Sequence, residues 1–242
     1  LGIAWLLDLE NSDGGWPTFC RGWGKLPFDR SGTDLTAHVL RALNAWREIY
    51  RSQRTEVPAR LARAIERGFD YLNGQQRPDG SWAPLWFGNQ YHPREENPVY
   101  GTARVLLAYS DLGRVNDEAA RRGAAWLAGQ QRRDGSWHEQ PSVEETALAT
   151  EALVAIDGGS VYHQHIERGL EWLIEAVEDG RFRQSSPIGF YFAKLWYYEA
   201  LYPLIFSVAA LGRAERQFRP MPSERRLDRP ARLPQPTLVV PA

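Results

Sequence analysis

Two side chains with acid–base chemistry stand four residues apart in the stretch TDLTAH, namely Asp34 and His38. If this stretch is helical, residues four apart lie on one helix face, so the carboxyl group and the imidazole are neighbours. An imidazole changes its charge near neutral pH and suits a site that moves protons. The pair is therefore a catalytic candidate. The alternative for His38 is a surface histidine, or a core histidine whose hydrogen bonds are satisfied.

Aromatic side chains are the second chemical resource, with 10 Trp, 10 Tyr and 9 Phe in 242 residues. They gather in loops that follow DG[G/S]W turns and in the last apolar stretch of the chain. Aromatic faces attract cations and are poor nucleophiles, so they can stabilise a carbocation without trapping it. Packing in the core is the alternative, and it is the more common role of an aromatic residue on a helix.

Further carboxyl groups occur in the stretches GTDLTA (32–37) and SVEETA (142–147). Both stretches read as the first turn of a helix, where acidic side chains interact favourably with the helix dipole. Helix capping is therefore our interpretation of both.

Several classes of site are not indicated. The chain has a single cysteine, Cys20, and no histidine stands at ligand spacing from it. We therefore expect no metal site. The 29 Lys and Arg residues nearly balance the 30 Asp and Glu residues, so no basic surface for nucleic acid is expected. The remaining histidines are scattered, at His92, His138, His163 and His165.

A repeated segment organises the chain. The stretches GIAWLLDLENSDGGW, GFDYLNGQQRPDGSW and GAAWLAGQQRRDGSW begin at Gly2, Gly68 and Gly123, and a shorter copy begins at Gly169 with Phe182 in place of Trp. Apolar residues recur at helical spacing, and the D-G-[G/S] turn then ends the helix where glycine adopts a positive φ. Each copy predicts a helix, a turn and an aromatic residue.

A second helical stretch follows each turn, beginning at Thr33, Asn97, Ser142 and Ala193. The first three of these residues are expected to be N-caps. The chain is thus predicted to be all-α, with four helical hairpins over residues 1–212 and no strands. Residues 213–242 are rich in Arg and Pro, and we expect them to be disordered.

The Gln and Trp of the repeat are expected to be structural. A glutamine late in the first helix can hydrogen-bond the backbone where the next helix begins, while the Trp of the turn stacks on it and shields it from water. The candidates are Gln75 or Gln76, Gln130 or Gln131, and the tryptophans Trp16, Trp82 and Trp137.

These turns resemble the QW repeats of the triterpene cyclases, the family of squalene–hopene and oxidosqualene cyclases, over nearly all of residues 1–213. The stretches TDLTAHVL, GSWAPLW with NPVYGT, and GFYFAKLWYYEALYP are similar to further segments of the bacterial enzymes, in the same order. The resemblance implies an α/α toroid around an aromatic-lined cavity. It also implies that the general acid of the family lies before Leu1, outside this chain.

The resemblance further assigns roles to single residues. His38 falls on the histidine that hydrogen-bonds the general acid, and Asp34 is its neighbour. Leu195 stands where a tyrosine of the family is expected, so the cavity is expected to differ in shape. The residues implied to line the cavity are Phe19, Trp86, Phe190, Tyr191 and Phe192.

The activity implied by the resemblance is acid-initiated cyclisation of a neutral, squalene-like polyene, without a metal or cofactor. A cytoplasmic protein that associates with a membrane surface is expected, with a homodimer as one assembly. Two alternatives stay open. The chain could belong to a cyclase for a different polyene, or to a toroid that binds an isoprenoid or a protein without catalysis.

Overall fold

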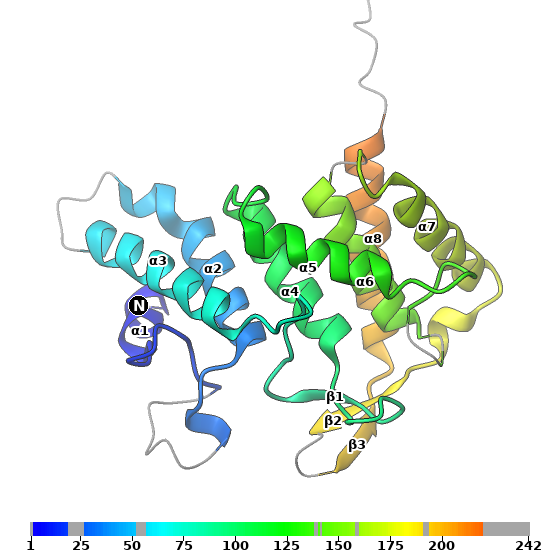
Figure 1. Cartoon of the computed structure of the whole chain (residues 1–242), viewed down its shortest axis with the longest axis horizontal. Helices are drawn as coiled ribbons and strands as arrows, with labels where there is room; N and C mark the ends of the chain where they lie inside the picture. The colour runs from blue at the N-terminus through cyan, green and yellow to red at the C-terminus, as the bar shows by residue number, and fades with distance from the viewer. Residues whose placement is uncertain are drawn as a thin grey trace, which may run out of the picture.

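The computed structural model describes residues 2–18, 27–51, 57–137, 140, 142–157, 160–190 and 194–219. Most of these residues are helical, as predicted (Figure 1). The helices are α1 (Gly2–Leu9), α2 (Thr33–Arg51), α3 (Val57–Gln75), α4 (Pro98–Asp111), α5 (Glu118–Gly129), α6 (Val143–Asp157), α7 (His163–Glu178) and α8 (Leu201–Phe218).

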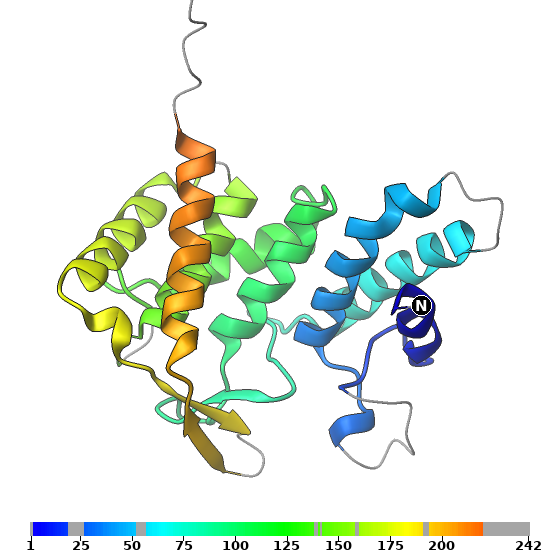
Figure 2. The ribbon, with the colours of Figure 1, turned by 180° about the vertical axis from the view of Figure 1, so that it is seen from behind.

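The helices form two layers. The second helices of the hairpins, α2, α4, α6 and α8, pack side by side as a row, and α3, α5 and α7 pack against that row (Figures 1 and 2). The buried apolar side chains lie mostly between the two layers, in one large cluster and in a smaller one between α6, α7 and α8. This is the predicted arrangement of an α/α toroid.

A small antiparallel sheet was not predicted. Strand β1 (Phe87–Asn89) pairs with β2 (Pro187–Phe190), which pairs with β3 (Leu195–Tyr198). The expected helix from Ala193 is therefore wrong, because α8 begins only at Leu201. Proline is tolerated in the first turn of a helix but not in its interior, so Pro203 fixes that late start.

Helix α8 also extends past the predicted end of the toroid at residue 212. Ala214 is buried, and the Nε atom of Arg213 lies 3.2 Å from an Oε1 atom of Glu151 on α6. The helix continues to Phe218, so residues 213–218 are helical and not part of the tail. Residues 220–242 lie outside the described residues.

Each turn tryptophan is fully buried and connects the two helices of its own hairpin. The predicted stacking of its ring on the glutamine stays a prediction. Its indole Nε1 donates to a carbonyl of the preceding helix, and its backbone N–H donates to a threonine hydroxyl at the start of the next helix. The carbonyls belong to Leu6, Leu72 and Leu127, at 2.8, 2.7 and 2.8 Å. The hydroxyls belong to Thr36, Thr102 and Thr146, at 3.0, 3.0 and 3.2 Å.

The glutamine prediction is confirmed, and the residues are Gln76 and Gln131. The Nε2 of Gln76 donates to the carbonyl of Ala119, 2.8 Å away at the start of α5. The Nε2 of Gln131 donates in the same way to the carbonyl of His165, 2.8 Å away on α7. Consecutive hairpins are thus connected by repeated hydrogen bonds.

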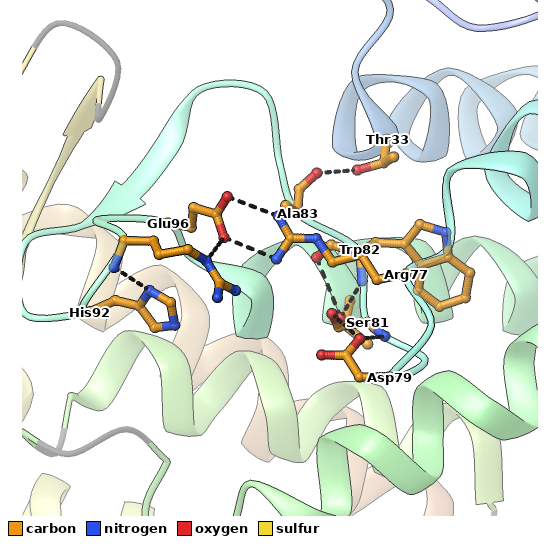
Figure 3. Close-up of polar contacts among 10 residues, drawn as sticks. Thr33, Arg77, Asp79, Ser81, Trp82, Ala83, His92 and Glu96 are labelled. Atoms are coloured by element: carbon orange, nitrogen blue, oxygen red, sulfur yellow. Dashed lines mark hydrogen bonds and ion pairs between the residues drawn. The ribbon is translucent and has the colours of Figure 1, made fainter.

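Two of the three predicted N-caps are confirmed. The side chains of Asn97 and Ser142 accept hydrogen bonds from the backbone N–H groups of Tyr100 (2.9 Å) and Glu145 (3.0 Å). The prediction for Thr33 is wrong, because Thr33 is itself the first residue of α2. Its hydroxyl instead donates to the carbonyl of Ala83, 2.8 Å away (Figure 3).

The loop between the second turn and α4 is fixed by polar contacts (Figure 3). In the turn, the backbone N–H and the hydroxyl of Ser81 donate to Asp79 Oδ1, at 2.9 and 2.7 Å. Arg77 forms a bidentate ion pair with Glu96, with both distances 2.9 Å. Bidentate pairs of this kind define both distance and orientation. The loop therefore holds β1 in a defined position beside α4.

The glycines Gly68, Gly123 and Gly169, which begin the second, third and fourth repeats, leave room for the tryptophan of the preceding repeat, and this gives a first prediction. A Cβ atom at Gly123 on α5 would lie 2.5 Å from the indole of Trp82, whereas one at Gly129 on the same helix would have no neighbour within 4 Å. We expect Gly123→Ala to lower the free energy of unfolding by about 1–3 kcal/mol. Gly129→Ala should leave it unchanged or raise it by up to about 1 kcal/mol. Equal urea midpoints for the two variants would contradict the packing described here.

Candidate active site

A cavity of about 130 Å³ lies where the first turns of α4, α6 and α8 meet the small sheet. Figure 1 shows the sheet next to this end of the helices. The lining combines aromatic rings with carboxyl, amide and hydroxyl groups. Its residues are Phe87, Asn89, Asn97, Tyr100, Arg104, Ser142, Glu144, Glu145, Leu148, Ser186, Pro187, Ile188, Tyr202 and Phe206.

Aromatic rings form much of the wall. The rings of Phe87 and Tyr100 have their centroids 4.8 Å apart, and those of Tyr202 and Phe206 stack at 5.3 Å. The guanidinium group of Arg104 lies over the rings of Tyr100 and Phe206, at 5.1 and 4.9 Å from their centroids. The wall therefore already holds one cation against its π faces.

Glu145, in the first turn of α6, is the most enclosed carboxyl group of this wall. Only 4% of the residue is exposed. The amide of Asn89 donates a hydrogen bond to its Oε1 atom, while Oε2 has no hydrogen-bond partner among the described residues. Burial raises the pKa of Glu145 to about 8, with the amides of Asn89 and Asn97 acting in the opposite direction. Glu145 is therefore mainly protonated at neutral pH.

The neighbouring Glu144 has its hydrogen bonds satisfied. Its Oε1 accepts from the backbone N–H of Ser186 at 2.7 Å, and its Oε2 accepts from the Ser186 hydroxyl at 2.9 Å. Burial raises its pKa, and these hydrogen bonds act against that effect. Capping explains neither glutamate, because Ser142 caps α6 and both carboxyl groups line the cavity.

Asp34 on α2 is a second buried carboxyl group, with 1% of the residue exposed. Its Oδ1 atom accepts from the backbone N–H of Leu85 at 3.3 Å, while Oδ2 has no hydrogen-bond partner among the described residues. Burial raises its pKa, whereas the backbone N–H of Leu85 and the charge of Arg104 lower it. This carboxyl group is thus kept in an environment that favours its neutral form.

His38 follows one turn later on α2 and is exposed at the surface. Partial burial of the ring lowers the pKa of His38 to about 4, and the positive charges of Arg104 and Arg41 act in the same direction. The imidazole is therefore neutral at pH 7. No hydrogen bond joins it to Asp34 within the part of the chain that the structure describes, so their predicted cooperation stays a prediction.

Residues 1–216 match the family model described as the squalene-hopene cyclase C-terminal domain. The chain belongs to that family. The matched region spans only 16–34% of the length of three curated cyclases that it resembles.

Relatives of this cyclase domain occur in bacteria and eukaryotes. It is 30% identical to squalene–hopene cyclase of Bradyrhizobium diazoefficiens over 201 residues, covering 72% of the chain and 28% of that enzyme. It is 28% identical to enfumafungin synthase of Hormonema carpetanum, covering 81% and 16%. Human lanosterol synthase is 25% identical, with 87% of the chain and 32% of that enzyme covered.

Solved structures agree with the fold of the cyclase domain. The ent-copalyl diphosphate synthase from Streptomyces platensis is similar with a TM-score of 0.64 at 26% identity, over 87% of this chain and 37% of that one. A type II terpene cyclase from Scytonema has a TM-score of 0.60 at 16% identity, over 88% and 67%. At 16% identity, the similarity to the Scytonema enzyme supports the fold alone.

The other predicted site residues of the cyclase domain are only partly described. Trp86 is buried, packs on Phe28 with ring centroids 4.9 Å apart, and is not among the residues that line the 130 Å³ cavity. The backbone of Phe190 pairs with Phe87 in the sheet, which brings its strand to the cavity. Phe19, Tyr191 and Phe192 lie outside the described residues.

The sequence analysis missed several cavity residues, and the repeat itself holds the signal that identifies them. Each threonine that binds a turn tryptophan marks the same point in the first turn of α2, α4 or α6. The residues one or two positions before that threonine include the cavity residues Tyr100, Glu144 and Glu145, with Asp34 at the equivalent position of α2. Aligning the second helices as well as the first would have placed these side chains at one end of the row.

Proposed function

We propose that this chain supplies part of the active site of an acid-initiated cyclase for a neutral, squalene-like polyene. The observation that carries the proposal is the cavity at the first turns of α4, α6 and α8, lined by aromatic rings. Membership of the cyclase family supports it. The general acid is expected outside this chain, as in the sequence analysis.

The chemistry requires a proton, a folded chain and a wall that stabilises cations. Protonation of a terminal alkene forms a tertiary carbocation, each following C=C bond attacks the cation before it, and loss of a proton ends the series. Aromatic faces stabilise such cations by their π electrons without forming a bond. We assign this role to Phe19, Trp86, Phe190, Tyr191 and Phe192, together with Phe87 of the cavity, because the guanidinium group of Arg104 lies over the rings of Tyr100 and Phe206.

His38 and Asp34 are proposed as positioning residues for the general acid. A neutral imidazole has one nitrogen that donates and one that accepts a hydrogen bond, so it can orient a carboxylic acid without competing for its proton at pH 7. The low pKa of His38 supports this role. A cyclase for a different polyene is the second candidate, because Leu195 occupies the position of an expected tyrosine.

The test is to incubate the protein, expressed from its complete reading frame, with squalene and to analyse products by gas chromatography with mass detection. Cyclised products are expected. His38→Ala should reduce their rate by at least about tenfold, as for the loss of a group that assists proton transfer. His163→Ala, on the exposed face of α7, is the control. Unchanged turnover in the His38 variant would remove it from the site, and a folded protein that binds squalene without product would favour the binding-only toroid.

A membrane surface is proposed as the source of this apolar substrate. None of the described helices is long and apolar enough to cross a bilayer. Helix α8, however, exposes Leu201, Leu204, Ile205 and Val208, with 43–64% of each accessible. We expect sedimentation with neutral phospholipid vesicles, reduced severalfold by Val208→Glu. A homodimer that buries α8 in the absence of vesicles would instead assign this face to protein contact.

A further inference from the structure

We propose that Glu145 recognises a neutral oxygen atom at one end of the ligand, so that the cavity holds a hydroxyl, ether or carbonyl group of an isoprenoid. The inference rests on the proposed function only in taking the ligand to be an isoprenoid. It assigns a role to a carboxyl group that the cyclisation scheme above does not use.

The hydrogen bonding of Glu145 indicates which group it offers. Its Oε1 atom accepts from the amide of Asn89, so the proton of the neutral carboxyl belongs on Oε2. Oε2 is the oxygen without a partner, and Glu145 lines the cavity. A buried donor without a partner costs about 1–3 kcal/mol, which an acceptor oxygen on the ligand would recover. The matching group is therefore a hydrogen-bond acceptor.

The charges around the cavity favour a neutral ligand group. Besides Glu145, the acidic and basic side chains of the lining are Glu144 and Arg104, one of each sign. A cationic group would be repelled by Arg104, which already covers the rings of Tyr100 and Phe206. A phosphate group would be repelled by the carboxylate of Glu144. A neutral oxygen meets neither penalty.

The size of the cavity limits what enters it. Its volume of about 130 Å³ is roughly ten times the ~10–15 Å³ that a cavity needs to hold one water molecule. This space suits the oxygen group and the first few carbon atoms of a ligand. The rings of Phe87, Tyr202 and Phe206 provide apolar contacts for those carbons. The cavity is thus an end-recognition site.

Glu145 is unsuited to start the cyclisation itself. Protonating an alkene requires a strong acid, whereas burial of Glu145 weakens its acidity by raising its pKa. A weak acid in an apolar wall is instead a good neutral hydrogen-bond donor. Recognition, and not initiation, is therefore the role we infer.

The experiment compares three probes of equal chain length, farnesol, farnesylamine and the hydrocarbon farnesene, by intrinsic tryptophan fluorescence on the complete protein. We expect farnesol to bind about three- to tenfold more tightly than farnesene, the range of one buried hydrogen bond. Glu145→Leu should abolish this preference, and Glu145→Gln should keep part of it because an amide also donates. Glu171→Gln, at an exposed position of α7, is the control. Tighter binding of farnesylamine, or equal binding of farnesol and farnesene to the unaltered protein, would overturn the proposal.

A second measurement covers the case in which Glu145→Leu fails to fold. The infrared C=O band of a protonated carboxyl group moves to lower frequency when its O–H donates a stronger hydrogen bond. We expect farnesol to shift such a band in the unaltered protein and not in Glu145→Gln. A band that does not move with bound farnesol would refute the role of Glu145. If farnesol binds as expected but squalene is not cyclised, the role of Glu145 stands and only the proposed reaction is refuted.

Discussion

Replacing Trp82 by alanine is expected to lower the free energy of unfolding by about 3–5 kcal/mol, the cost of deleting a large buried side chain. Trp82 has no exposed surface, and its indole Nε1 donates to the carbonyl of Leu72 at 2.7 Å. The ring also fills the space above Gly123 on the next hairpin. The substitution therefore opens a cavity between two hairpins and leaves the Leu72 carbonyl without this partner.

The matched control is Trp46→Ala on α2. Trp46 is 49% exposed, so its removal should cost well under the loss at Trp82, about 1 kcal/mol or less. Urea unfolding followed by circular dichroism measures both losses. Similar losses for the two variants would show that Trp82 does not connect the hairpins as described.

The second large effect concerns pH and Glu145. Its pKa is about 8 in the folded protein against a usual value of 4.5, so the folded state binds a proton that the unfolded state has released. The stabilisation by this proton is fully present below pH 4.5 and is lost as the pH rises through about 8. Between these values the free energy of unfolding should fall by up to about 1.4 kcal/mol per pH unit.

Glu145→Gln removes this titration and tests the sign. The variant should become more stable relative to the unaltered protein as the pH rises from 5 to 8, as measured by urea midpoints across that range. Burial also raises the pKa values of Glu144 and Asp34, so both proteins should still lose some stability with rising pH. The difference between them isolates Glu145, and parallel curves would contradict a raised pKa for this group.

The helical hairpins and their connections could be predicted because their causes are local in the sequence. Trp82, Gln76 and Gly80 stand within one short repeat, and their roles follow from a turn that must end one helix and meet the next. The same reasoning failed for Thr33, because its hydroxyl binds the carbonyl of Ala83, 50 residues later in the sequence, and not the start of its own helix.

The cavity could not be predicted, because its parts are distant in the sequence and depend on burial. Phe87 and Phe190 become neighbours only through strand pairing, and no local sequence pattern indicated these strands. The carboxyl groups of Glu144 and Glu145 look like ordinary first-turn acids until the sheet and α8 cover them. Their enclosure raises their pKa values, and only the tertiary structure reveals that environment.

The hydrogen bonds from Gln76 and Gln131 join the second hairpin to the third and the third to the fourth. Such a molecule behaves energetically like a row of nearest neighbours, in which the total stability is a sum of unit and interface contributions. A hairpin at an end of the row has one interface and one inside has two, so opening under force or denaturant should proceed inward from an end. The same modularity allows whole hairpins to be duplicated or exchanged between homologous chains with their connecting residues intact, which makes the hairpin the natural unit for engineering the fold.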